Sequence, residues 1–231
     1  MAKKRIAVLI SGRGSNLLAL IQAAKQPDYP VEISLVLSDR AEATGLSHAR
    51  AAGIETAIVD HATHRNDRQA FEQMIQKLLV ERDIEFVCLA GFMRLLTPWF
   101  VSRWDGRLIN IHPALLPAFK GLDTHRRALA AGVKIHGASV HFVVAEMDSG
   151  PIIAQGAVPV HDDDDAETLA ARVLAIEHRI YPAALALVAM GRVKTIDGRC
   201  FVEGSRSNEG TLIVPEPDDE GRMPTNRSRM V

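Results

Sequence analysis

A polar pair stands at the end of an apolar run near the middle of the chain. Residues 107–121, RLINIHPALLPAFKG, place Asn110 and His112 two positions apart, and Pro113 follows directly. Alternate side chains of an extended strand project to the same side, so the amide and the imidazole can face one ligand. Open α/β sheets bind ligands at the carboxyl ends of their strands. The pair therefore predicts an amide donor beside an acid–base group, although a buried Asn and His that only satisfy loop carbonyls would give the same pattern.

A carboxylate in a later turn offers this pair a charge partner. The turn DSGP begins at Asp148 and separates two β-rich runs. An ionised carboxylate beside an imidazole favours the protonated ring, so Asp148 is a candidate to keep His112 charged. The competing interpretation is a simple turn former, a common use of Asp at such positions. His136 and His141, in the stretch HGASVHFV, are predicted to be structural or to support the pair.

A glycine turn after the first apolar run has the form of an anion site. SGRGSN, residues 11–16, lies between RIAVLI and a helical pattern, where backbone N–H groups and the helix dipole attract a phosphate. The dinucleotide fingerprint requires a glycine where this chain has Leu17, and no Lys-Ser or Lys-Thr pair completes a P-loop. NAD and ATP are therefore disfavoured. A tight turn that needs Gly12 and Gly14 only for backbone shape explains the motif equally well.

One carboxylate lies beside the apolar stripe of the last long helical pattern. Glu177 neighbours the stripe formed by Leu169, Val173, Ile176 and Ile180. A carboxylate in such a place needs a partner. It either extends to solvent at the margin of the stripe or receives an amine or hydroxyl group of a ligand, and the ligand interpretation is preferred.

The elements that must position these residues follow from the hydrophobic pattern. Short apolar runs without alternation are typical of strands covered on both faces, and they alternate with helical patterns through the first half of the chain. Later, GASVHFVV and PIIAQGAVPV are joined by a turn, which predicts antiparallel strands. The predicted fold class is α/β, a doubly wound Rossmann-like sheet with a parallel core and antiparallel strands added in the C-terminal half. Expected strands are 5–10, 31–37, 55–59, 84–90, 107–111, 137–144 and 151–160; expected helices are 16–25, 44–52, one from about 66 and one after HDDDD, residues 161–165.

The domain organisation predicted from these elements is simple. Residues 1–203 form one domain, with a nucleotide-binding half at about 1–105 and a catalytic half at about 106–203. Within it, RVKTI and RCFVE are expected to pair near the end. Residues 204–231, rich in Ser, Asn, Pro, Glu and Arg, are expected to form a flexible tail that packs little.

Composition limits the class of protein. The 231 residues are 47% hydrophobic and 24% charged with a net charge of −1, which argues against disorder and against a basic nucleic-acid surface. No apolar run approaches the ~20 residues that cross a bilayer, and Cys88 and Cys200 make no disulfide framework, so a cytoplasmic location is expected. HATH, residues 61–64, has no evident third ligand, and no metal is predicted.

Six motifs together carry a family resemblance. SGRGSN, LAGFMRLL, INIHPALLPAFKG, HGASVHFV, DSGP and EHRIYP occur in this order, over about residues 5–200. In order and separation they resemble the glycinamide ribonucleotide formyltransferase family, the folate-dependent enzymes of purine synthesis. Members transfer a formyl group from 10-formyltetrahydrofolate to the primary amine of glycinamide ribonucleotide. The resemblance implies these two small molecules as partners, with no metal, nucleic acid or membrane, and leaves the oligomeric state open, a homodimer included.

The resemblance also implies roles for individual residues. Catalysis is expected of Asn110, His112 and Asp148, with Asn110 and protonated His112 donating to the formyl oxygen and Asp148 keeping the histidine charged. Stabilisation of such an oxyanion acts on the transition state more than on the ground state. The residues implied to bind the ribonucleotide are Gly14, Ser15, Asn16 and Glu177; those implied to bind folate are Arg68, Met93, Arg94, Leu95, Leu96, Asn110, Val144, Ala145, Glu146, Met147 and Asp148.

Three alternative functions stay open at this point. Formyltetrahydrofolate hydrolases and methionyl-tRNA formyltransferases share the same Asn, His and Asp pattern, so the resemblance extends to both. Both usually carry a further domain, so the short flanks of this chain favour the purine enzyme. A non-catalytic nucleotide-binding module would use the glycine turn and leave the Asn-His-Asp group without a role.

Overall fold

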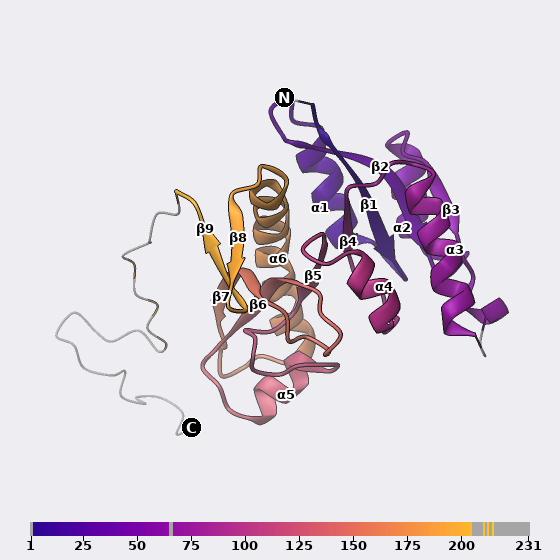
Figure 1. The fold of residues 1–231 in the computed structure, drawn as a ribbon. Helices are drawn as coiled ribbons and strands as arrows, with labels where there is room; N and C mark the ends of the chain where they lie inside the picture. Colours follow the sequence, from indigo (N-terminus) through magenta and orange to yellow (C-terminus); the bar gives the residue numbers. More distant parts are fainter. Residues whose placement is uncertain (1, 65–66, 205–209, 211, 213, 215–231) are drawn as a thin grey trace, which may run out of the picture.

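A seven-stranded sheet forms the centre of the molecule. The computed structural model describes residues 2–64 and 67–204, together with residues 210, 212 and 214, and Figure 1 shows its ribbon. The strand order is β3-β2-β1-β4-β5-β6-β7. Strands from both predicted halves of the chain share this one sheet, because β4 pairs with β5. The predicted tail, residues 204–231, lies largely outside the described residues.

The first five strands are parallel and the last two are antiparallel, as predicted. Nearly every residue of β1 and β5 is buried, which agrees with strands covered on both faces. In β6 and β7 the chain reverses through the DSGP turn, and a separate hairpin, β8 with β9, follows the last helix. The strands are β1 (Lys4–Ile10), β2 (Val31–Ser38), β3 (Thr56–Ile58), β4 (Phe86–Leu89), β5 (Leu108–His112), β6 (Ile135–Phe142), β7 (Ile152–Pro159), β8 (Val193–Ile196) and β9 (Arg199–Val202).

Helices cover both faces of the sheet and enclose two apolar cores. One core joins α1, α2 and α6 to the sheet, and Figure 1 shows α1 and α6 side by side. The other core joins α3 and α4 to the opposite face. The helices are α1 (Ser15–Ala24), α2 (Gly45–Ala51), α3 (Arg68–Val80), α4 (Pro98–Arg103), α5 (Thr124–Ala130) and α6 (Ala166–Ala189), with a short 3-10 helix at His61–His64. Among the described residues, no helix has both the length and the apolar character that a membrane crossing requires.

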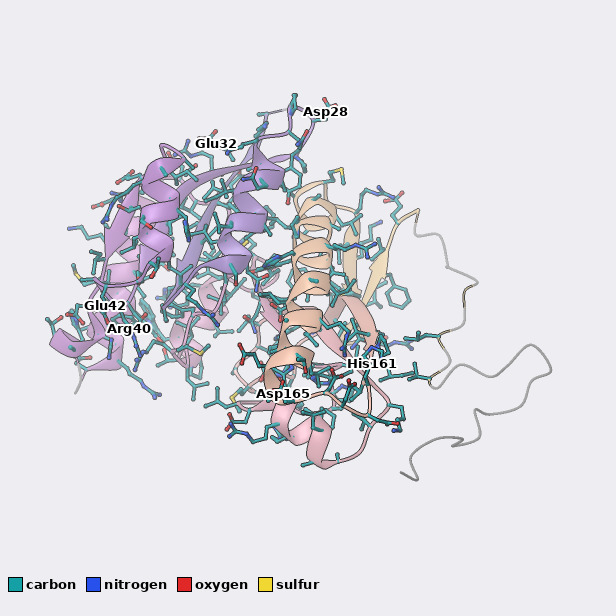
Figure 2. The ribbon with its side chains drawn as sticks, turned by 180° about the vertical axis from the view of Figure 1, so that it is seen from behind. Asp28, Glu32, Arg40, Glu42, His161 and Asp165 are labelled. Carbon is teal, nitrogen blue, oxygen red and sulfur yellow. The ribbon has the colours of Figure 1, made fainter. Side chains whose placement is uncertain are left out.

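The long helix α6 begins where the acidic run predicted it. Asp165 Oδ1 accepts the backbone N–H groups of Glu167 and Thr168, and Thr168 Oγ1 accepts the backbone N–H of Asp165 in return, which completes a capping box. Figure 2 labels Asp165 at this end of the helix. The prediction of a helix directly after HDDDD is confirmed, and the last residue of this run is its N-cap.

Two details of the helices differ from the prediction. The helix predicted from about Asn66 begins at Arg68, after Asp67 accepts the N–H of Ala70, and Asn66 itself lies outside the described residues. The spacing of Phe71, Met74, Ile75, Leu78 and Leu79 predicts one buried apolar stripe, yet Met74 is 46% exposed, and Glu72 is buried in the same helix. Glu72 accepts the backbone N–H and the hydroxyl of Thr97, the residue before α4, and this pairing permits its burial.

The carboxyl edge of the parallel strands collects the predicted site. The chain leaves β1 for α1 on one face and reaches β4 from α3 on the other, so the strand order switches between β1 and β4, and open α/β sheets bind ligands at such a switch point. Figure 2 labels Glu32 near the start of β2 and Arg40 just beyond its end, which marks the direction of the strands. The glycine turn, the segment after β4 and the end of β5 all lie at this edge.

Candidate functional site

His112 has an oxygen partner at each ring nitrogen. Its side chain ends β5 and is only 5% exposed. Nε2 lies 3.0 Å from the carbonyl oxygen of Phe119, and Nδ1 lies 3.4 Å from Asp148 Oδ2. A carbonyl oxygen can only accept, so Nε2 carries a proton; a second proton on Nδ1 then faces the carboxylate. The geometry therefore suits the imidazolium form of His112.

Asp148 is fixed in a strained turn. Its φ of 49° lies in the left-handed region, which costs a non-glycine residue about 1 kcal/mol or more. Oδ2 accepts the backbone N–H of Gly121 at 2.8 Å, a bond that aims the carboxylate at His112. Gly150, at the end of the DSGP turn, cannot carry a side chain, because a Cβ would overlap the carbonyl oxygen of Phe142. The turn therefore reverses the chain and also places the Asp148 carboxylate beside His112.

Asn110 is oriented by a histidine on the neighbouring strand. Asn110 and His141 are paired in the register of β5 and β6. His141 Nδ1–H donates to its neighbour's carbonyl oxygen, that of Phe142, at 2.9 Å, which leaves Nε2 as the acceptor for Asn110 Nδ2 at 3.2 Å. Burial lowers the pKa of His141, which favours this neutral form. Asp148 Oδ1 lies 3.8 Å from the same Nε2, so one continuous group links Asn110, His141, Asp148 and His112.

The buried side chain of His136 supports the loop that faces His112. His136 is 1% exposed and packs edge-on against the ring of Phe119, with centroids 5.7 Å apart. Burial lowers the pKa of His136 to about 4, so it is neutral at neutral pH. The prediction that His136 and His141 are structural or supporting agrees with these contacts.

The glycine turn has the backbone geometry of an anion site. Gly14 precedes α1 with a φ of 76°, and no side chain caps the helix there. The first-turn N–H groups, which begin at Ser15 and Asn16, are therefore available to a ligand at the positive end of the helix dipole. Gly14 is also closely packed, because a Cβ on it would lie 2.7 Å from Gly45 Cα. Both the conformation and the close approach require glycine.

Glu177 is buried and has a partner within the protein. It is 6% exposed on the packed face of α6, beside Val173 and Tyr181, so the alternative of extending to solvent is wrong. Glu177 Oε2 accepts a hydrogen bond from Asn16 Nδ2 at 2.7 Å. Burial raises the pKa of Glu177, and the Asn16 donor opposes that rise. Asn16 Oδ1 is buried and makes no hydrogen bond to another described residue.

The segment after β4 lies directly beside the glycine turn. Ser11 donates its N–H to the Gly91 carbonyl oxygen at 3.1 Å and accepts the N–H of Met93 on its hydroxyl at 2.8 Å. Met93 and Leu95 are 61% and 59% exposed, so this segment presents two large apolar side chains to the surface. The implied ribonucleotide and folate segments are thus hydrogen-bonded to one another.

The remaining implied folate residues are less closely tied to this group. Residues 145–147 are exposed in the loop before Asp148, and Lys120 joins this loop to the loop that follows β5 by donating to Ser149 Oγ at 2.6 Å. Arg68 is exposed at the start of α3, and it makes no hydrogen bond or ion pair with another residue in the described part of the chain. Within the same ranges no group of three or more His, Cys, Asp or Glu side chains is arranged to hold a metal ion.

Sequence reasoning missed three contributors to the site. Two are backbone groups, the Phe119 carbonyl and the Gly121 N–H, and no residue type signals such a role. The third is Asp39, which follows β2 and is bonded to Arg94. Its position after an apolar strand is the signal that singled out Asn110 and His112, so this residue was detectable.

Comparisons with known proteins agree with this geometry. The family described as formyl transferase matches residues 4–185. The human trifunctional purine biosynthetic protein adenosine-3 is 49% identical over 192 residues, which are 83% of this chain and 19% of that relative, so the chain spans about a fifth of its length. Phosphoribosylglycinamide formyltransferase of Escherichia coli K12 is 46% identical over 204 residues, covering 87% of this chain and 94% of the relative.

A solved structure extends the comparison to the fold. The crystal structure of glycinamide ribonucleotide transformylase 1 from Symbiobacterium toebii superimposes with a TM-score of 0.84 at 45% identity. The match covers 87% of this chain and 94% of the Symbiobacterium toebii chain. The resemblance drawn from the six sequence motifs is thereby confirmed, and the chain belongs to the formyl transferase family.

Proposed function

We propose that this chain transfers the formyl group of 10-formyltetrahydrofolate to the amine of glycinamide ribonucleotide, in de novo purine biosynthesis. One observation carries the proposal: His112, with an oxygen at each ring nitrogen, is linked through Asp148 and His141 to the amide of Asn110 at the carboxyl edge. The names of the Escherichia coli and Symbiobacterium toebii relatives support the same reaction.

The two substrates are assigned to neighbouring parts of this edge of the sheet. The phosphate of the ribonucleotide binds the backbone N–H groups of Gly14, Ser15 and Asn16 at the start of α1, and Glu177 receives the glycinamide portion. The folate binds along residues 93–96 and the loop 144–148, with Arg68 at its outer end. The bonds of Ser11 to Gly91 and Met93 support this assignment, because they hold the two binding segments together.

The chemistry follows from this arrangement. The neutral amine attacks the formyl carbon, a C–N bond forms, and negative charge develops on the formyl oxygen. Asn110 and the His112 imidazolium donate hydrogen bonds to that oxygen. For this, the formyl oxygen replaces the Phe119 carbonyl oxygen as the partner of His112 Nε2, while Asp148 stays beside Nδ1. The bond to the folate nitrogen then breaks, and that nitrogen gains the proton that the amine loses. No covalent enzyme intermediate is needed.

The direct test is an assay of tetrahydrofolate release with and without glycinamide ribonucleotide. We expect release that depends on the nucleotide, with formylated nucleotide formed in equal amount. Release without the nucleotide would indicate a hydrolase, and binding without release would indicate a module that only binds nucleotide. Either result would overturn the proposal.

Substitution of Gly14 by Ala tests the anion site. The variant is expected to lose about 1–2 kcal/mol of stability and to bind the ribonucleotide much more weakly than the folate, because the left-handed φ and the approach to Gly45 both exclude a Cβ. Thermal unfolding and the two KM values measure these effects. Gly53→Ala is the matched control, since Gly53 has a φ of 73° with open space around it. An equal rise of both KM values in Gly14→Ala would contradict the assignment of the phosphate to this turn.

Glu177→Gln separates substrate binding from stability. Loss of the charge is expected to raise the KM for the ribonucleotide about tenfold, the effect of one charge-assisted hydrogen bond. Because burial raises the pKa of Glu177 in the folded protein, its contribution to stability declines as pH rises through that pKa. The unfolding temperature of the variant relative to wild type should therefore be higher at pH 8 than at pH 5.

Glu167→Gln provides the control for Glu177, because Glu167 is an exposed carboxylate on the same helix. It should leave the ribonucleotide KM unchanged. An unchanged KM in Glu177→Gln as well would reduce Glu177 to a structural tie between α6 and α1.

A further inference from the structure

The loop between β5 and α5 meets the pair of His112 and Asp148 through three consecutive residues. The carbonyl oxygen of Phe119 lies 3.0 Å from His112 Nε2, and the N–H of Gly121 donates to Asp148 Oδ2 at 2.8 Å. Between these two, Lys120 extends its side chain to the turn that carries Asp148. Two of the contacts come from backbone groups, so their direction depends on what holds the loop in place. Lys120 supplies a side-chain contact that can do so.

Lys120 bridges this loop to both sides of Asp148. Its Nζ donates to Ser149 Oγ at 2.6 Å and lies 3.5 Å from Glu146 Oε1. The Ser149 hydroxyl donates its one proton to the carbonyl oxygen of Met147 at 2.9 Å, and its lone pairs can accept from the ammonium. The bridge therefore connects the loop to the residue before Asp148 and to the residue after it.

The bond to Ser149, rather than the ion pair, is the part of the bridge that can set a position. The Glu146 side chain is 77% exposed, and exposed ion pairs contribute little and hold no fixed geometry. The bond to the Ser149 hydroxyl is short and charge-assisted, and the Lys120 side chain that makes it is half-buried. It is the stronger and more directional of the two contacts.

The two segments have strained backbones where they meet. Phe119 and Asp148 have φ angles of 52° and 49°, in the left-handed region that disfavours residues with a side chain. Such conformations persist only where surrounding contacts hold them. Gly121 packs closely here too, since a Cβ on it would lie 3.5 Å from Met147 Cε. Without the bridge, fewer contacts oppose relaxation of the turn, and relaxation would move the Asp148 carboxylate away from His112 Nδ1.

The backbone of the loop has a separate anchor in α5. Arg127 donates from Nη1 to the carbonyl oxygens of Lys120 and Leu122 at 2.6 Å and 3.3 Å. Its guanidinium also lies 5.7 Å from the ring centroid of Phe119. Loss of the Lys120 ammonium is therefore expected to leave the loop folded and to release mainly the turn at Asp148.

We infer that Lys120 is a positioning residue for formyl transfer: through Ser149, its ammonium holds the Asp148 carboxylate where His112 needs it. Lys120 contacts neither substrate and acts through Asp148. The inference rests on the proposed function and deepens it, because it names the side chain that keeps the charge of the site aligned. A lysine that only formed a surface ion pair with Glu146 would have no such effect.

The first test removes the ammonium and its acceptor separately. In Lys120→Met, which keeps an unbranched side chain, kcat is expected to fall about 10-fold to 10²-fold, as displacements of up to about 1 Å do. The KM for the ribonucleotide should stay within about twofold, and Ser149→Ala should lower kcat by a similar factor. Lys134→Met is the control, because Lys134 makes an equally short bond, 2.6 Å, to Asp162 on the surface. Normal kcat in either folded variant of the bridge would overturn the inference.

A double variant shows whether Lys120 acts through Asp148. When Lys120→Met is added to Asp148→Asn, kcat should change less than about twofold, because the charge that the bridge positions is already absent. A further tenfold loss would overturn the inference, since Lys120 would then act on another part of the site.

Amide hydrogen exchange, followed by NMR, provides a measurement that does not depend on catalysis. Exchange of the Gly121 N–H, which is bonded to Asp148, should become faster in Lys120→Met and Ser149→Ala but not in Lys134→Met. Unchanged exchange in the first two variants would overturn the inference. Wild-type protein that transfers no formyl group would instead count against the proposed function, and the exchange of Gly121 would still decide whether the bridge holds the turn.

Discussion

Asp148→Asn is expected to fold and to lose about 10²–10³-fold in kcat, the typical cost of disabling one oxyanion donor. Asparagine can still accept the N–H of Gly121, so the turn keeps its anchor. It has no charge to balance an imidazolium 3.4 Å away at His112 Nδ1. Steady-state kinetics measure this loss, and thermal unfolding shows that the variant folds.

An exposed aspartate outside the proposed site supplies the control for Asp148. Asp162 is paired with Lys134 at 2.6 Å on the surface. Asp162→Asn changes the net charge by the same amount and should leave kcat nearly unchanged. A folded Asp148→Asn protein with near-normal kcat would remove Asp148 from the role of charging His112.

Asn110→Ala is expected to lower kcat by about 10²–10³-fold, because it removes an amide donor that acts on the developing charge. Both KM values should change little, since the interaction strengthens only in the transition state. His141 Nε2 would lose its donor, at a cost of about 1 kcal/mol in stability. Thermal unfolding must therefore accompany the kinetics.

Asn110→Asp separates the role of the amide as a hydrogen-bond donor from the role of the size and shape of the side chain. Aspartate keeps the size of the side chain but offers only acceptor oxygens at neutral pH, so activity should fall at least as far as in the alanine variant. Near-normal kcat in either folded variant would show that the amide serves only to order His141.

Local patterns predicted the strands and the helices α1, α2, α3 and α6, but missed the helices α4 and α5. Apolar runs such as RIAVLI identified β1, because a strand covered on both faces has no polar positions. The helices α4 and α5 span 6 and 7 residues, too few to show a helical period above the noise of composition. Met74 fits the apolar spacing of α3 yet is largely exposed, because the buried face of this helix is formed by Phe71, Glu72, Ile75 and Leu79.

The sequence by itself determined which chemical groups stand at the ends of the strands. Asn110 and His112 share one side of β5 through strand geometry alone, and the glycine turn before α1 has a conformation that its residue types favour. These features are local, so a single stretch of sequence contains them.

Only the tertiary structure decided which of these groups meet. Glu177 is hydrogen-bonded to Asn16, which lies 161 residues away in the chain. Asp148 lies beside His112 because a strained turn and a bond from the Gly121 N–H hold its carboxylate there. Such contacts depend on strand order and on backbone atoms that are the same in every residue. Residue types made Asp148 a candidate partner of His112, but only the folded chain brought the two side chains within 3.4 Å of each other.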